Sequence, residues 1–178
     1  MRYFQLKQDR RVPNVATIDA KLDMKKIWET EEGLFFPYKK NNLDMGREDV
    51  IFLPLVEFPV SVTEKAFFIL EETKKVFETY QTDTEYRQFG LGNLQKRDLK
   101  VYHFMKPLKI ECLSEKTEFK PNNEVEKLVL DRSKIGSHRV FQVSDLRANY
   151  LIVSLEVVEV LLSKQINEFE IIEVECEG

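Results

Sequence analysis

The sequence has few of the residues from which small proteins build disulfide frameworks, metal centres or phosphate-binding loops. Its 178 residues include two cysteines, two histidines and six glycines. Cys112 and Cys176 are too few for a disulfide framework, so we expect both to be reduced and packed as small hydrophobic side chains. His103 and His138 lie far apart and match no HExxH or CxxC spacing. We therefore predict no metal, no cofactor and a reducing compartment.

Long apolar segments and concentrated basic charge are also missing. No segment approaches the about 20 apolar residues of a membrane-spanning helix, and the polar opening lacks the apolar centre of a signal peptide. The formal net charge is −4, and the basic residues are scattered among acidic ones. Nucleic-acid-binding proteins usually gather basic charge on one face. These features predict a cytoplasmic protein that binds neither membrane nor nucleic acid, and they leave a basic protein partner open.

The pattern that is present is a succession of β-like segments around two candidate helices. The length suits one α+β domain over residues 1–178, weakly patterned over about 1–56 and better defined over about 57–178. We predict a mostly antiparallel sheet with two amphipathic helices, at about 63–80 and 155–165, packed on it.

Each helix has a candidate start signal. Thr63 is a hydroxyl N-cap for the first helix, whose apolar face includes Val76 and Tyr80. Ser154 is a similar cap for the second, although its many valines leave a strand open as an alternative. The two helix starts look alike, but the shared stretch is too short to indicate a duplication.

The remaining segments give more local predictions. Residues 84–91 and 99–105 are typical of the two arms of a β-hairpin, and residues 33–42 are typical of a loop. The closing segment 169–177 alternates apolar and acidic residues, as an edge or solvated strand does. Asp23 caps a short helix that carries Trp28, for which core packing, or a place as a lid over the core, is the favoured interpretation.

No set of residues assembles into a recognisable catalytic site. Cys112 lies in an alternating strand rather than at a helix N-terminus that would lower its pKa. Asp131 could act as an acid, a base or a metal ligand, but a turn cap is the simpler role. Gly90-Leu91-Gly92 lacks the third glycine of a dinucleotide-binding loop. We therefore predict that the protein is not an enzyme.

The closing segment carries a row of carboxylates that has two interpretations. It is either a solvated face, or a negative surface that steers a basic partner. We predict the second, and the partner-binding residues are Glu170, Glu173, Glu175 and Glu177.

Several segments occur in an order along the chain that is similar to that of a known family. They are MRYF at the start, VSVTEK at 60–65, IECLSEKTEF at 110–119, LDRSKI at 130–135, VFQV at 140–143, YLIV at 150–153 and LEVVE at 155–159. The family that they resemble is the eleventh immunity-protein family of bacterial polymorphic toxin systems, earlier described only as a domain of unknown function. The similarity is weak over about residues 16–49.

The resemblance implies a small cytoplasmic antidote. Such a protein binds the toxin domain encoded beside it and blocks that domain by stoichiometric occlusion, as a monomer or weak homo-oligomer. The family offers no catalytic residues to assign. Two other functions stay open. One is a generic interaction or scaffold module that self-associates through an exposed strand edge such as the last strand. The other, less favoured, is a small enzyme whose pocket joins His103, Asp131 and Cys112.

Overall fold

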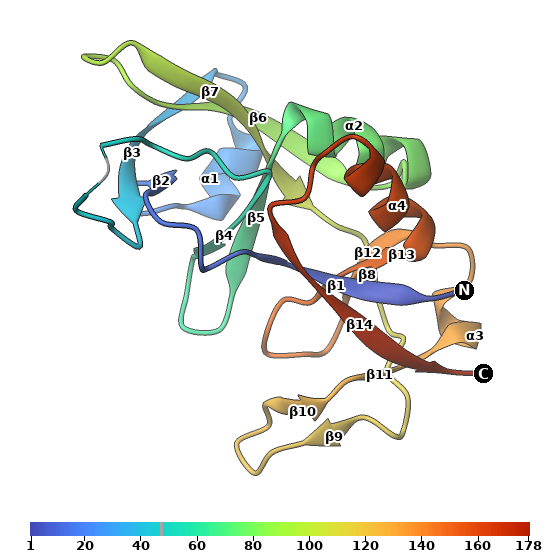
Figure 1. The fold of residues 1–178 in the computed structure, drawn as a ribbon. Helices are drawn as coiled ribbons and strands as arrows, with labels where there is room; N and C mark the ends of the chain where they lie inside the picture. Colours follow the sequence, from blue (N-terminus) through green and yellow to red (C-terminus); the bar gives the residue numbers. More distant parts are fainter. Residues whose placement is uncertain (47) are drawn as a thin grey trace.

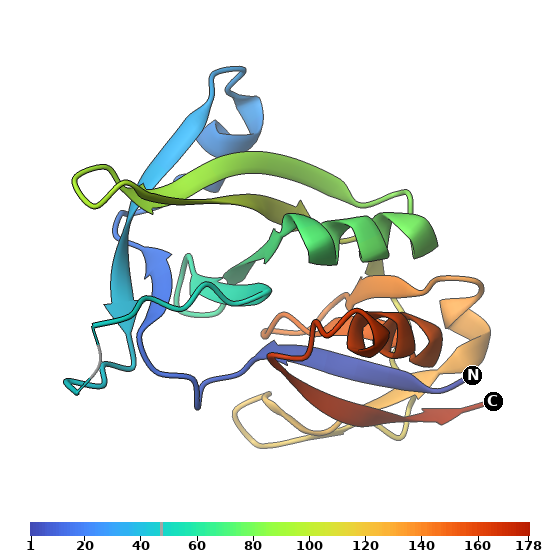
Figure 2. The ribbon, with the colours of Figure 1, turned by 45° about the horizontal axis from the view of Figure 1, so that its top comes forward.

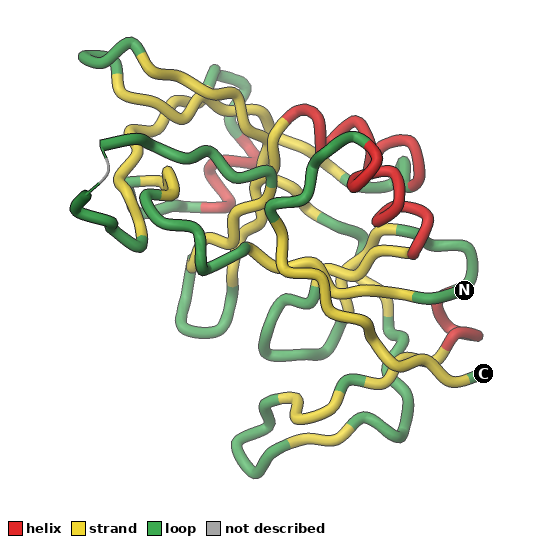
Figure 3. Tube along the Cα trace, viewed as in Figure 1, coloured by secondary structure: helices red, strands yellow, loops and turns green. Residues whose placement is uncertain are grey.

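The computed structural model describes residues 1–46 and 48–178, and it is a mixed α+β fold in which strands predominate (Figures 1 and 3). Four helices accompany the strands in the described ranges. They are α1 (Met24–Glu29), α2 (Glu71–Tyr80), α3 (Arg132–Ile135) and α4 (Leu155–Ser163).

In the described part of the chain, the strands form two six-stranded sheets and a short hairpin. The first sheet, in spatial order, is β2 (Val15–Ile18), β3 (Leu34–Asn41), β6 (Glu85–Asn93), β7 (Asp98–Lys106), β5 (Lys65–Leu70) and β4 (Leu55–Pro59). The second is β11 (Val129–Asp131), β14 (Phe169–Glu177), β1 (Tyr3–Gln8), β13 (Leu151–Ser154), β12 (Val140–Val143) and β8 (Lys109–Ile110). The hairpin is β9 (Glu118–Phe119) with β10 (Val125–Lys127).

Backbone hydrogen bonds link the two edges of each sheet. In the first sheet, the Ile51 amide just before β4 donates to the Asn14 carbonyl beside β2 at 3.0 Å. In the second sheet, the Ser114 amide in the segment after β8 donates to the Val129 carbonyl of β11 at 3.0 Å. Both sheets therefore curl until their edges meet, and we call them the first barrel and the second barrel.

The two barrels share one strand plan. In the first, β3 runs parallel to β6, and β7, β5 and β4 follow antiparallel to their neighbours. In the second, β11, β14, β1, β13 and β12 repeat that sequence of directions. Helix α2 joins β5 to β6, and α4 joins β13 to β14. The chain is thus one unit repeated twice, with the first strand of each unit, β1 or β7, placed in the barrel of the other.

The repeat extends to individual side chains. Tyr102 lies opposite Leu70, the residue before α2, and Tyr3 lies opposite Ser154, the residue before α4. The Tyr102 hydroxyl donates to the carbonyl of Leu53 at 2.7 Å, and the Tyr3 hydroxyl donates to the carbonyl of His138 at 3.2 Å. Each acceptor stands two residues before β4 or β12. The residue that matches Ser154 is therefore Leu70 and not Thr63, so the structural repeat differs from the short likeness seen in the sequence.

Three apolar cores follow from the alternation of side chains along the strands. Phe68 of β5 points into the first barrel, whereas Phe67 and Ile69 point out of it into a central core. Similarly, Ile152 of β13 points into the second barrel and Val153 into the central core. Helices α2 and α4 pack side by side in that central core between the barrels (Figure 2).

Two of our predictions about helices have different outcomes. The helix predicted at 63–80 is wrong over residues 63–70, because Lys65–Leu70 forms strand β5 and the helix starts at Glu71. The aromatic run in that stretch favours a strand buried on both faces. Thr63 lies exposed before β5 and caps no helix. The second helix is confirmed and follows Ser154 directly, but the Ser154 hydroxyl makes no capping hydrogen bond.

Several strand predictions also change. The hairpin is confirmed as β6 and β7, and the closing strand as β14. However, β14 lies between β11 and β1, so it is not an edge strand. The predicted loop at 33–42 contains β3, whose side chains alternate strictly between half-buried and exposed. Pro37 fits there because it lies beyond the last β2–β3 pair, Ile18 with Tyr38. In the described ranges most strand pairs are antiparallel, as predicted, but three are parallel, so both sheets are mixed.

Candidate functional site

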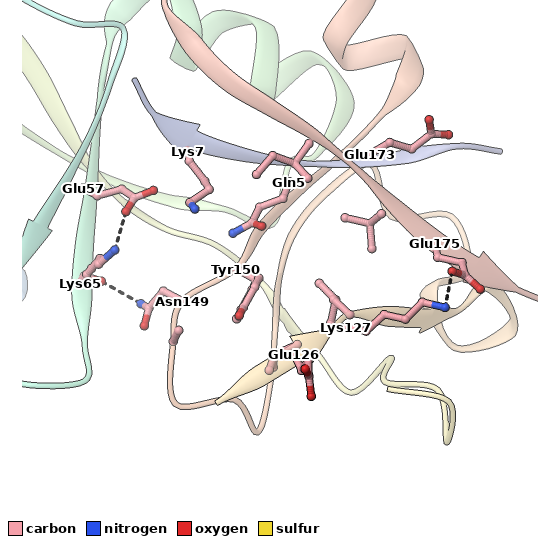
Figure 4. Close-up of a pocket in the computed structure, with 15 residues that line it drawn as sticks. Gln5, Lys7, Glu57, Lys65, Glu126, Lys127, Asn149, Tyr150, Glu173 and Glu175 are labelled. Carbon is pink, nitrogen blue, oxygen red and sulfur yellow. Dashed lines mark hydrogen bonds and ion pairs between the residues drawn. The ribbon is translucent and has the colours of Figure 1, made fainter. Parts of the chain in front are cut away.

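A polar hollow of about 510 Å³ opens at one end of the second barrel (Figure 4). Strands β1 and β14, the β4–β5 pair, the β10–β11 segment and the approach to β13 supply its walls. The lining residues are Gln5, Lys7, Glu57, Lys65, Val125, Glu126, Lys127, Leu128, Ala148, Asn149, Tyr150, Ile172, Glu173, Val174 and Glu175.

Strand alternation explains why polar groups gather there. Tyr3 points into the second barrel, so Gln5 and Lys7 on the same face of β1 emerge where the apolar interior ends. Val174 of β14 is likewise buried in the barrel, and Ile172 beside it is 38% exposed. The hollow is therefore the polar continuation of the second barrel's core.

One wall is fixed by a buried carboxylate. The Glu57 side chain is only 5% exposed, and it accepts a hydrogen bond from the Lys65 ammonium at 2.7 Å. The backbone amide of Gln8 also donates to Glu57 at 3.3 Å. The Asn149 side-chain amide donates to the Lys65 carbonyl at 2.8 Å, which ties the second barrel to the first. A buried charge needs such partners, so this wall holds one conformation.

Exposed ion pairs lie along β14 at the rim of the hollow, on the outer face of that strand, and the Glu173 carboxylate turns away from Lys7 (Figure 4). Arg2 donates two hydrogen bonds to Glu173, both at 2.7 Å, and Lys127 meets Glu175 at 2.8 Å. The hydrogen bond from Arg2 lowers the pKa of the Glu173 carboxyl, and the hydrogen bond that Lys127 donates to Glu175 raises the pKa of Lys127. Exposed pairs of this kind add little to stability. Their effect here is to hold charged groups in position.

Two charged residues of the hollow remain without a partner. Among residues 1–46 and 48–178, neither Lys7 nor Glu126 forms an ion pair, and Figure 4 shows the Lys7 ammonium directed into the hollow. Tyr150 lies close by and is half-buried, and burial raises its pKa, so the phenol remains a hydrogen-bond donor. Together with Gln5, these groups can bind a carboxylate or amide of a ligand.

The predicted acidic row is split by the fold. Glu173 and Glu175 line the hollow, while Glu177 pairs with Lys116 at 2.5 Å and accepts a hydrogen bond from Ser114. Glu170 lies on the opposite face of β14, in register with Lys7, but forms no ion pair with it. Three of the four carboxylates are thus neutralised within the chain. The row is not a continuous free negative surface.

The residues considered for catalysis lie in separate places. His103 is buried beneath α2, with its Nε2 2.6 Å from Glu71; burial lowers the pKa of His103, and Glu71 partly opposes this. Cys112 is buried in the second barrel, which raises its pKa to about 11. Asp131 accepts a hydrogen bond from the Ser133 amide at 2.9 Å and caps α3, which confirms its predicted turn role. His103 is not brought together with the other two.

Sequence reasoning missed most of the hollow. Gln5, Lys7, Glu57, Lys65 and Asn149 are ordinary surface residue types, and they come from four separate segments of the chain. Only the sequence of β1 indicated part of the site, because its side chains alternate between two faces. Gln5 and Lys7 therefore share the face of Tyr3, which is buried.

Neither a metal centre nor a membrane span is found in the part of the chain that the structure describes. No three His, Cys, Asp or Glu side chains gather as ligands there. Similarly, none of the described helices has the length and apolar character needed to cross a bilayer. Comparison with protein-family models, with curated proteins and with solved structures gave no match for this chain.

Proposed function

We propose that the protein is a cytoplasmic immunity (antitoxin-like) protein that binds a cognate toxin domain, encoded beside it, and neutralises it by stoichiometric occlusion. The observation that carries the proposal is the hollow, whose charged walls are fixed by ion pairs before any partner arrives. A preorganised polar concavity suits a protruding loop of another protein, because little conformational entropy is lost on binding. The family resemblance of the sequence supports the same function.

Lys7 is the central anchor in this proposal. It is the one lysine of the hollow without an acidic partner in the described ranges, and Gln5 and Tyr150 lie beside it. An acidic side chain of the toxin would replace the missing partner. A hydrogen bond to a charged group contributes roughly 1.5–3 kcal/mol, which corresponds to about a 10- to 100-fold change in Kd.

The test mixes the purified chain with the toxin domain encoded by the neighbouring gene. Calorimetry gives stoichiometry and Kd, and co-expression gives protection from growth arrest. We expect a one-to-one complex, protection, and loss of about 10-fold or more in affinity for Lys7→Glu. Lys21→Glu is the matched control, since it makes the same charge change at the first barrel. Absence of a complex, or a complex without protection, would remove the proposal.

The alternative of a self-associating module relied on the last strand as an open edge. Strand β14 pairs with β1 over Phe169–Val174 and with β11 only over Glu175–Glu177, so the edge left to a second copy is limited to one side of residues 169–174. Light scattering that gives a dimer mass would favour self-association over the proposed function.

A further inference from the structure

The outer face of the first barrel carries a contiguous apolar surface, which we call the hairpin patch. Its members are Phe35 of β3, Leu99 and Val101 of β7, and Leu94 in the β6–β7 turn, exposed by 42%, 54%, 41% and 76%. The tip of this hairpin projects at one end of the molecule in both ribbon views (Figures 1 and 2). Single exposed apolar side chains are ordinary, but a group of them marks an interaction site.

A glycine makes the patch continuous. A Cβ atom at Gly90 would lie 3.1 Å from Leu99 Cδ1 and 3.2 Å from Phe35 Cδ2, so these two side chains close over the bare backbone between them. Val101 lies opposite Gly90 on the neighbouring strand. The result is a shallow apolar floor between strands rather than isolated side chains.

Unpaired basic groups surround the turn. In the described ranges Lys96, Arg97 and Lys100 have no ion-pair partner. The one acidic side chain of the turn, Asp98, already accepts a hydrogen bond from the Tyr38 hydroxyl at 3.3 Å. The chain as a whole has a net charge of −4, so this tip is a local reversal of sign.

We infer that the hairpin patch is a second docking surface, and that it binds an acidic protein surface with an apolar centre on the toxin domain. The inference rests on the proposed function for the identity of the partner. Apolar anchors ringed by charge are the usual anatomy of a protein interface. Anionic lipid or nucleic acid fits less well, because its negative charge extends beyond the patch and meets the rest of this acidic chain, whereas a protein can confine acidic charge to the contact area.

Two variants separate the apolar and electrostatic parts of the surface. Leu99→Thr with Val101→Thr removes the apolar contact and keeps good strand formers. Lys96→Gln, Arg97→Asn and Lys100→Gln remove the charge, and asparagine tolerates the positive φ of 52° at position 97. Leu162→Gln is the control, since Leu162 is 45% exposed on α4, away from the hairpin. Circular dichroism and Tm establish that each variant is folded.

Binding to the neighbouring toxin domain is measured by stopped flow and calorimetry at low and high salt. We expect the apolar variant to lose about 10-fold or more in Kd, mainly through faster dissociation. The charge variant should associate more slowly and lose its salt dependence, while Leu162→Gln binds as wild type.

If wild type forms no complex, the proposed function fails together with this inference. If wild type binds and both hairpin variants bind equally well, only the docking surface fails. Phosphatidylserine vesicles are the second probe; hairpin-dependent binding to them with unchanged toxin affinity would overturn the inference in favour of a membrane contact.

Discussion

The two barrels end differently at matching positions. Lys106 of β7 and Lys7 of β1 are equivalent, since each stands four residues after the matched tyrosine of its strand. Lys106 pairs with Glu85 at 3.0 Å and lies 5.7 Å from the centre of the Trp28 ring, so the lysine and the indole close that end of the first barrel. The matching Lys7 has no such cover and faces the hollow.

The interiors and outer faces differ as well. Phe104 fills the first barrel where the second has Gln5. On the outside, Gly90 of the first barrel matches Glu175 of the second, so a bare apolar floor stands where the other barrel has an ion pair. The two barrels thus share one arrangement of strands but differ in their side chains. The first barrel is filled and has an apolar outer surface, whereas the second is open at one end and polar there. The fold alone does not decide what either end binds.

The largest expected effect comes from deleting residues 1–8, because β1 stands between β13 and β14. The deletion removes Tyr3, Phe4 and Leu6, which are 2%, 9% and 1% exposed. Their burial contributes about 5–9 kcal/mol, against a total stability of roughly 5–15 kcal/mol. We expect no cooperative unfolding transition by circular dichroism.

A permuted chain is the control for that deletion. Moving residues 1–8 behind Gly178 through a short Gly-Ser linker would make β14 and β1 a hairpin like β6 and β7. The termini lie close together in Figures 1 and 2, and Tyr3 pairs with Val174, so the linker has little distance to span. If the permutant folds and the deletion variant does not, the result supports the placement of β1 in the barrel of the other unit. A deletion variant with wild-type Tm would contradict it.

The second prediction exchanges the side chains at one matched position. Phe104→Gln leaves a cavity and a buried amide among aromatic rings, at a cost of about 3–5 kcal/mol. Gln5→Phe should change stability by less than about 1 kcal/mol, because the hollow has room for the ring. It should also close the hollow and abolish toxin binding. Denaturant titration and calorimetry measure both effects; equal destabilisation by the two variants would mean that the barrels do not differ in filling.

The third prediction compares the matched tyrosines. Tyr102→Phe leaves the fully buried Leu53 carbonyl without its 2.7 Å donor, and we expect a loss of about 1–2 kcal/mol. Tyr3→Phe removes a longer bond, 3.2 Å, to a carbonyl near the surface, and should cost roughly 0.5–1 kcal/mol. Urea denaturation with unchanged m values gives the comparison. The reverse order would show that the second barrel depends more on its tyrosine.

Local patterns in the sequence predict the elements that one face or one turn determines. The alternation of apolar and acidic residues predicts β14, and the turn residues between two aromatic segments predict the β6–β7 hairpin. Asp23 predicts the start of α1, and in the structure its carboxylate accepts a hydrogen bond from the Lys26 amide at 3.1 Å. Residues 65–70 mislead because a strand buried on both faces has no alternation, so its apolar run matches a helix equally well. Only tertiary structure separates the two.

The hollow could not be predicted for a different reason. Its residues come from segments as distant as Lys7 and Glu175, and their meeting depends on β1 crossing into the barrel of the second unit. The duplication is hidden for a similar reason. The units share strand directions and a tyrosine contact, while matched positions hold unlike residues, such as Phe104 and Gln5. The two units therefore share their backbone arrangement although their side chains differ at matched positions.

The smallest expected effect concerns the pair beneath α2, His103 with Glu71, whose matched residues beneath α4 are the apolar Phe4 and Leu155. Burial lowers the pKa of His103 below its ordinary 6.5, although Glu71 opposes this. As pH falls through about 6.5, the unfolded chain takes up a proton that the native histidine does not, so the free energy of unfolding decreases. The decrease stops once the native His103 itself is protonated.

We expect His103→Gln to flatten the dependence of Tm on pH between about pH 7 and pH 5. Glu71→Gln should widen the window instead, because it removes the group that raises the pKa of His103. A His103→Gln variant that keeps the wild-type slope would show that His103 has the same pKa in the folded and unfolded states and adds no pH dependence, like the apolar pair beneath α4, which has no titratable group.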